Sequence, residues 1–166
     1  MLLFTILFLW GVVLYNRLVR DHKRVLAAWS DIDVQLKRRH DLLPKLVEAV
    51  KQYTAYEQAT MTAVTELRAQ AIKASSMKER CHCETALSEG VLQLIAISES
   101  YPELKANYNF IDLQENITSV EKYIQYARRY YNGCVRNFNE RIDSFPSILV
   151  AKLFRFTAAE FFIYEK

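Results

Sequence analysis

Glycine and proline are scarce in this chain, which has only three of each among its 166 residues. Tight turns and sheet corners depend on these two residues, so their scarcity argues against an all-β fold and favours long helices. The few glycines form neither a GxGxxG nor a GxxxxGK[ST] pattern. The sequence therefore argues against the common nucleotide-binding folds.

Cysteine is scarce as well, and the three that are present make an odd number. A secreted disulfide framework uses an even number, so a reducing compartment is the better prediction. Cys81, His82 and Cys83 resemble a metal cluster at first sight. Residues two apart on a helix point in nearly opposite directions, however, and structural zinc needs four ligands. We predict no metal site and no cofactor.

The sequence also lacks any arrangement typical of an active site. Serine, histidine and aspartate occur without a motif that places them together, and Asp31 and Asp33 lie on opposite faces if they are helical. We therefore predict a protein without enzymatic activity, catalytic residues or a small-molecule substrate. A thiol- or metal-dependent activity around Cys81, His82 and Cys83 is the alternative.

An excess of charge is confined to one place. The chain has 22 Lys and Arg against 19 Asp and Glu, a net charge of +3. The segment after residue 16 accounts for all of it, through Arg17, Arg20, Lys23 and Arg24 against Asp21. The rest of the chain is balanced, which argues against a nucleic-acid partner.

A long apolar run opens the chain. Residues 1–15, MLLFTILFLWGVVLY, contain one clearly polar side chain, Thr5. Residues 1–19 make a helix of roughly 28 Å, close to the hydrocarbon thickness of about 30 Å. We predict an N-terminal membrane helix over residues 1–19. A buried helix of an oligomer is one alternative, and a signal peptide is another, although the run has no basic start and no cleavage site.

The basic segment that follows predicts an orientation. Cationic side chains favour the cytoplasmic side of a membrane, so Met1 should lie outside and the bulk of the chain in the cytoplasm. The four cations would bind anionic lipid headgroups. The predicted location is thus the cell membrane, with a single pass.

After this segment, apolar residues recur in alternating steps of three and four, as in packed helices. We predict an all-α fold, an elongated antiparallel helical bundle with an N-terminal transmembrane-type helix. Residues 20–166 would form the bundle domain, with helices at about 20–75, 77–100, 108–144 and 147–156. The two clearest apolar series are Val25, Trp29, Ile32, Leu36, Leu43, Leu46, Val50 and Tyr53, and Phe110, Leu113, Ile117, Val120, Ile124, Ala127, Tyr131, Cys134 and Phe138.

One proline interrupts the first series without changing its phase. Pro44 should bend the helix axis near residues 40–44, and Asp41 could cap a new helix start there. Just before it, Lys37, Arg38 and Arg39 form a cationic block, and Arg39 occupies an apolar position of the series. We predict that these cations meet carboxylates of a neighbouring helix or chain.

Two asparagines near the second apolar series are candidates for setting helix register. Asn132 and Asn139 are seven residues apart, and each follows an aromatic residue of the series. Asparagine near a helix seam often fixes register and oligomeric state, because its amide requires a partner. A polar binding groove is the alternative role.

These segments resemble the LemA family of bacterial membrane-anchored helical proteins. The likeness is carried by WSDIDVQLKRRHDLLPKLVEAVKQYTAYE at 29–57, YPELKANYNF at 101–110, YNGCVRNFNERIDSFP at 131–146 and, more weakly, FRFTAAEFF at 154–162. The resemblance implies an all-α bundle with an N-terminal membrane helix and a poorly defined function. It assigns no catalytic residue. The family usually has Asn where Lys45 stands and Gly where Gln52 stands.

The function predicted from the sequence is a membrane-anchored, non-enzymatic helical scaffold, whose partners are membrane lipids, other copies of itself and other proteins. The alternative is a self-assembling structural protein, since a short apolar helix can satisfy itself by oligomerising. In that assembly the apolar helices of a large homo-oligomer would pack through Leu2, Leu3, Ile6, Leu9 and Val13.

Overall fold

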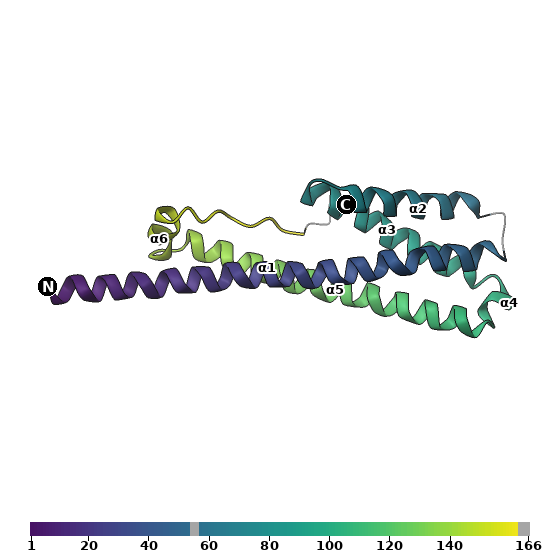
Figure 1. Cartoon of the computed structure of the whole chain (residues 1–166), viewed down its shortest axis with the longest axis horizontal. Helices are drawn as coiled ribbons and strands as arrows, with labels where there is room; N and C mark the ends of the chain where they lie inside the picture. The colour runs from purple at the N-terminus through teal and green to yellow at the C-terminus, as the bar shows by residue number, and fades with distance from the viewer. Residues whose placement is uncertain (54–56, 163–166) are drawn as a thin grey trace. The chain divides into compact units, whose positions relative to one another are not determined.

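The computed structural model describes residues 1–53 and 57–162, without the side chains of Leu2 and Leu3. All regular structure in these residues is helical, and the chain is a helical bundle, which confirms the predicted fold class at that level (Figure 1). The helices are α1 (Leu2–Lys51), α2 (Gln58–Lys73), α3 (Met77–Ser98), α4 (Pro102–Lys105), α5 (Tyr108–Asp143) and α6 (Ser147–Leu153).

The chain divides into two compact units. Unit 1 comprises Met1–Ile32 and Ala127–Phe161, and unit 2 comprises Asp33–Tyr126 and Phe162–Lys166. The two longest helices, α1 and α5, each contribute to both units. Each unit has its own buried apolar residues.

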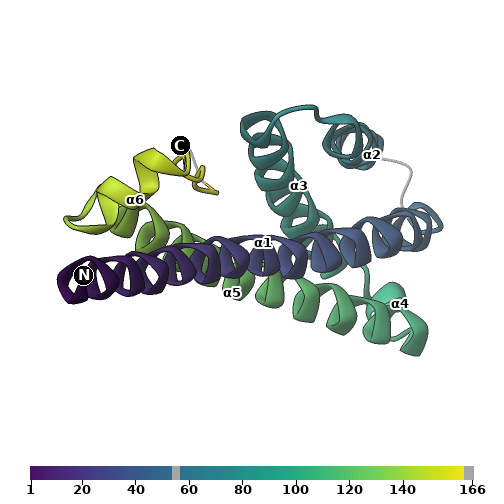
Figure 2. The same cartoon turned by 60° about the vertical axis from the view of Figure 1, so that its left-hand side comes forward.

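In unit 1, the first part of α1 pairs with the last part of α5. His22 contacts Phe138 with ring centroids 5.4 Å apart, and Trp29 contacts Tyr131 at 5.5 Å. Residue numbers thus rise along one helix as they fall along the other, which makes the pair antiparallel. After α5 the chain turns into α6 (Figure 2).

In unit 2, apolar residues of α1, α2, α3, α4 and α5 share one core. Helices α2 and α3 lie alongside each other (Figure 1). Their approach is close at Gly90 of α3, where an added Cβ would lie 2.8 Å from Cγ2 of Val64 in α2. Glycine is required there by contact and not by a backbone angle, since no glycine has a positive φ among the described residues.

The prediction of one long helix after residue 20 is wrong. We expected one helix over about 20–75, but α1 ends at Lys51 and α2 begins at Gln58. By doubling back, α2 places Met61 and Val64 in the same core as Val50. A straight helix would carry Val64 about 20 Å beyond Val50. The helices expected at 77–100, 108–144 and 147–156 correspond to α3, α5 and α6, while the short α4 was not predicted.

The predicted transmembrane helix is not supported either. Within the described residues, no helix is long and apolar enough to cross a membrane. The predicted span, residues 1–19, contains one charged side chain, Arg17.

A pair of glycine substitutions tests the close packing of α2 on α3. Gly90→Ala should lower the free energy of unfolding by about 1–3 kcal/mol, because the new methyl group overpacks the contact with Val64. Gly133→Ala is the matched control in the interior of α5, where an added Cβ meets nothing within 4 Å. It should stabilise the protein by about 0.5–1 kcal/mol. Urea unfolding measures the free energy of unfolding of both variants. Equal changes for Gly90→Ala and Gly133→Ala would refute the close contact.

Candidate functional site

The most unusual side chain of unit 2 is Arg39, a permanent cation that is 0% exposed. Its Nη1 donates to Oγ of Ser88 at 2.5 Å and to Oε1 of Glu121 at 2.8 Å. Its Nη2 donates to the backbone oxygen of Glu84 at 3.0 Å and to the carboxylate of the same residue. Arg39 thus joins α1 to both α3 and α5 inside the bundle.

The acidic centre of this cluster is Glu84, which is also 0% exposed. Its Oε1 lies 3.1 Å from Nε2 of His40. Burial raises the pKa of the Glu84 carboxyl, but the hydrogen bond from His40 and the charge of Arg39 outweigh it. The pKa therefore lies below its ordinary value of 4.5, and Glu84 is an anion at neutral pH.

We call Arg39, His40, Glu84, Ser88 and Glu121 the buried charge cluster. Its one permanent cation, Arg39, pairs with two carboxylates, so the buried guanidinium is not left without a counter-charge. Arg39 and Glu84 have no exposed surface, which closes them to a dissolved substrate. No group of three or more metal-binding side chains was found in the described part of the chain. The arrangement is suited to holding helices together.

Pro44 lies inside α1, which continues through it to Lys51. The helix does not restart at Asp41, contrary to one predicted role of that residue. Because proline has no N–H, it cannot donate to the carbonyl of His40, four residues earlier. Nε of Arg68 in α2 donates to this carbonyl at 2.8 Å. Pro44 thus leaves a backbone acceptor that α2 satisfies, and its role as a bend stays a prediction.

The cationic block before Pro44 is not used uniformly. Lys37 and Arg38 are exposed, and Nη2 of Arg38 donates to Oδ1 of Asn116 at 3.2 Å. Only Arg39 turns into the core, where it meets carboxylates of two neighbouring helices. Pairing of Lys37 or Arg38 with another chain stays a prediction.

The two register candidates belong to unit 1. The amide of Asn139 donates to the backbone oxygen of Ala159 and accepts from its N–H, both at 2.9 Å. The hydroxyl of Tyr131 donates to the backbone oxygen of Glu160 at 2.8 Å. Asn139 therefore holds the segment after α6, while Asn132 is half-buried on α5. Their role in fixing an oligomer stays a prediction.

The surroundings of Cys83 do not activate its thiol. Cys81 is buried, Cys83 is half-buried and His82 is exposed. Burial, together with the charges of Glu84 and Glu79, raises the pKa of the Cys83 thiol. A raised pKa suppresses the nucleophilic thiolate at neutral pH.

The N-terminal part of α1 presents its apolar side chains to the surroundings. Ile6, Leu9 and Val13 are 61%, 59% and 49% exposed, while the side chains of Leu2 and Leu3 lie outside the described part. The flank of Arg17, Arg20, Lys23 and Arg24 is exposed as well. Arg20, Lys23 and Arg24 help to line a hollow of about 500 Å³ with Asn16, Val19 and Ala27.

Sequence reasoning missed most of the buried charge cluster. It placed Arg39 at an apolar position but found none of its partners. A second signal was available in α3, where Glu84 stands in the apolar series with Cys81, Leu87, Val91 and Leu94. Two opposite charges at core positions of different helices indicate an internal ion pair.

A double-mutant cycle tests the hydrogen bond between Arg68 of α2 and the backbone carbonyl of His40, which Pro44 leaves without a helical donor. Arg68→Ala should lower the free energy of unfolding by about 1–3 kcal/mol, because it leaves the carbonyl of His40 without its donor. In a Pro44→Ala background the new N–H of residue 44 can donate to that carbonyl. Arg68→Ala should then lower the free energy of unfolding by clearly less. Gln70→Ala, at an exposed position of the same helix, is the control. Equal costs of Arg68→Ala in both backgrounds would show that the two residues act independently.

Comparisons with known proteins agree with the family resemblance of the sequence motifs. The sequence pattern of the LemA family matches residues 28–166. Protein LemA of Metamycoplasma hominis is 28% identical over 142 residues, a match that covers 82% of this chain and 63% of that protein. The chain thus spans less than two thirds of the length of that relative. Because the family pattern covers most of its residues, the chain belongs to the LemA family.

Proposed function

We propose that this protein is a non-enzymatic helical scaffold held on a membrane by the start of α1. The apolar residues 4–13 would enter the hydrocarbon of the bilayer, and the cationic flank would bind the headgroups. Proteins would be the partners of the bundle. The observation that carries the proposal is the exposure of eight large apolar side chains between residues 4 and 13. They are Phe4, Ile6, Leu7, Phe8, Leu9, Trp10, Val12 and Val13, at 40–76%.

The pattern of exposure favours lipid as the surrounding of this segment. Residues 6–10 are five consecutive exposed apolar residues, and five residues cover more than one helical turn. A helix that lies on a protein or in a membrane surface shows one apolar stripe. Apolar exposure on all sides suits a medium that is apolar on all sides. The proposal requires insertion of this segment and not a complete crossing.

The cationic flank fits an anionic bilayer surface. Arg17, Arg20 and Lys23 are exposed directly after the apolar segment. Each cation near an anionic surface contributes about 1 kcal/mol to binding, and salt screens that contribution. Arg24 is partly engaged, since its Nη1 lies 3.4 Å from Oδ1 of Asp21.

The absence of enzymatic activity is part of the proposal. Arg39 and Glu84, at the centre of the buried charge cluster, have no exposed surface, and the pKa of the Cys83 thiol is raised and not lowered. These features suit a structural role for the bundle. Membership of the family adds no catalytic residue to them.

Flotation of the full-length protein with lipid vesicles tests membrane binding. It should float with vesicles of phosphatidylcholine and phosphatidylglycerol, and less with phosphatidylcholine alone. Replacing Arg17, Arg20 and Lys23 by Gln should weaken binding to the anionic vesicles about a hundredfold at low salt. Lys51, Lys73 and Lys105 are exposed elsewhere, and their replacement by Gln is the control with equal charge change.

Two outcomes would contradict the proposal. A protein that stays with the unbound fraction for both vesicle types would have no membrane function of this kind. A homo-oligomer whose mass is the same with and without lipid, and which shields the apolar segment, would support the self-assembling structural protein instead.

A further inference from the structure

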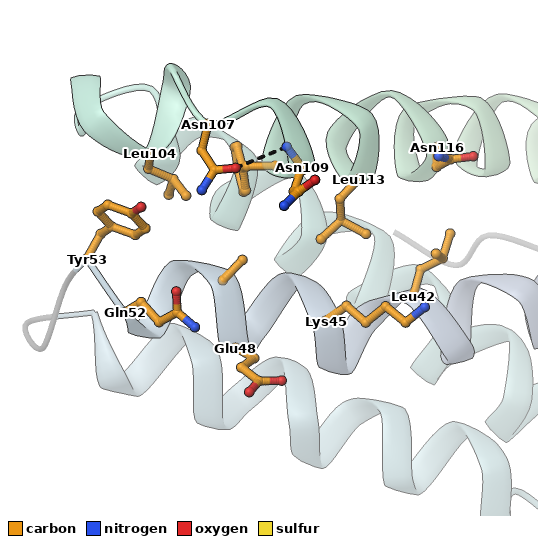
Figure 3. Close-up of a pocket in the computed structure, with 12 residues that line it drawn as sticks. Leu42, Lys45, Glu48, Gln52, Tyr53, Leu104, Asn107, Asn109, Leu113 and Asn116 are labelled. Atoms are coloured by element: carbon orange, nitrogen blue, oxygen red, sulfur yellow. Dashed lines mark hydrogen bonds between the residues drawn. The ribbon is translucent and has the colours of Figure 1, made fainter.

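Unit 2 contains a cleft that the proposed membrane function does not use. It lies between the last turns of α1 and the chain that runs from α4 into α5 (Figure 3). Its volume is about 440 Å³, which lies within the usual range for ligand sites. Since all of its lining residues belong to unit 2, the inference below does not depend on membrane binding.

Carboxamide side chains dominate the polar part of the cleft. They are Gln52, Asn107, Asn109 and Asn116. Oδ1 of Asn107 accepts from the backbone N–H of Asn109 at 3.0 Å, as Figure 3 shows. Asn116 is engaged with Arg38 and with the backbone of Asp112.

Two of the four carboxamides keep their full hydrogen-bonding capacity. The side-chain amides of Gln52 and Asn109 make no hydrogen bond to any residue that the structure describes. A carboxamide offers two N–H donors and one carbonyl acceptor. The peptide group carries the same two functions, so these amides match the N–H and C=O groups along an extended peptide.

The charges of the cleft argue against a strongly anionic ligand. One cation, Lys45, and one anion, Glu48, line it, and neither forms an ion pair within the described residues. The two charges balance, whereas sites for phosphate or nucleic acid gather several cations. A ligand without net charge fits this lining best.

The apolar part of the lining favours a peptide over a sugar. Leu42 and Leu113, both half-buried, supply aliphatic surface for side chains of a bound segment. A sugar ring needs an open aromatic face, but Phe110 is only 3% exposed and Tyr53 is half-buried. Aliphatic surface beside free carboxamides matches a chain that alternates peptide groups with apolar side chains.

We propose that this cleft binds a short, extended, uncharged peptide segment of a partner protein. The free amides of Gln52 and Asn109 pair with its backbone, and the leucines contact its apolar side chains. The site lies in the bundle and gives it a means of selecting partners.

The test uses the full-length, ¹⁵N-labelled protein in mild detergent and the capped tripeptide acetyl-Leu-Ala-Leu-amide as the probe. At millimolar peptide, the side-chain NH₂ signals of Gln52 and Asn109 should shift. Those of Asn137 and Gln70, which are exposed outside the cleft, should stay in place. Cellobiose, an uncharged disaccharide, is the second probe and should leave all four signals unchanged.

Two substitutions make the test specific. Gln52→Ala and Asn109→Ala should each raise the Kd of the peptide about three- to tenfold, because each removes direct hydrogen bonds. Asn137→Ala is the matched control on α5 and should leave the Kd unchanged. All three residues are exposed, and the backbone spectrum reports whether the fold is retained. Absent peptide shifts, shifts with cellobiose alone, or unaltered binding in both cleft variants would overturn the proposal.

Discussion

Unit 2 depends on one constraint: a guanidinium that cannot lose its charge is buried in the bundle core. Arg39 of α1 is stable there only if other helices bring anions to it, and Glu84 of α3 and Glu121 of α5 do so. Removing one partner of a buried pair typically costs about 3–5 kcal/mol, since it leaves a charge uncompensated. The cluster therefore restricts how three helices align, because a shift along any helix axis would separate the charges. Apolar contacts alone tolerate such shifts more readily.

A second arginine meets a different requirement at the same end of α1. Pro44 leaves the carbonyl of His40 without its helical donor, and Arg68 supplies one from α2. The side chain of His40, in turn, contacts Glu84. Residues 39–44 thus connect α1 to α2, α3 and α5 through polar contacts, while the leucines beside them fill the core. Arg39 and Pro44 both serve to join helices, because Arg39 pairs with α3 and α5 and the carbonyl left open by Pro44 accepts from α2.

Apolar periodicity predicted the helical bundle and the approximate extents of α3, α5 and α6, because a repeated three–four spacing is a local property. It did not predict the end of α1 at Lys51. The series stays in phase beyond that point, so the reversal is visible only when Val50 and Val64 are placed in one core. The partners of Arg39 were missed for a similar reason, since they lie 45 and 82 residues further along the chain. Asn139 was a candidate for fixing helix register, and the sequence pattern did not indicate that its amide holds the backbone of Ala159. The predicted membrane span relied on adding a charged flank to a short apolar run.

The most direct test of the buried cluster is the pH dependence of unfolding in wild type and Glu84→Gln. The pKa of Glu84 lies below 4.5 in the folded chain, so the carboxylate stabilises the fold above about pH 4.5, and this contribution disappears as the pH falls through the folded pKa. The free energy of unfolding of wild type should exceed that of the variant by about 3–5 kcal/mol at neutral pH, because the variant loses one partner of the buried pair. The difference should shrink steadily below about pH 4.5. The exposed Glu115→Gln should show no such difference. A stability difference for Glu84→Gln that is absent at neutral pH, or that persists unchanged in acid, would contradict an ionised Glu84 as the anchor of Arg39.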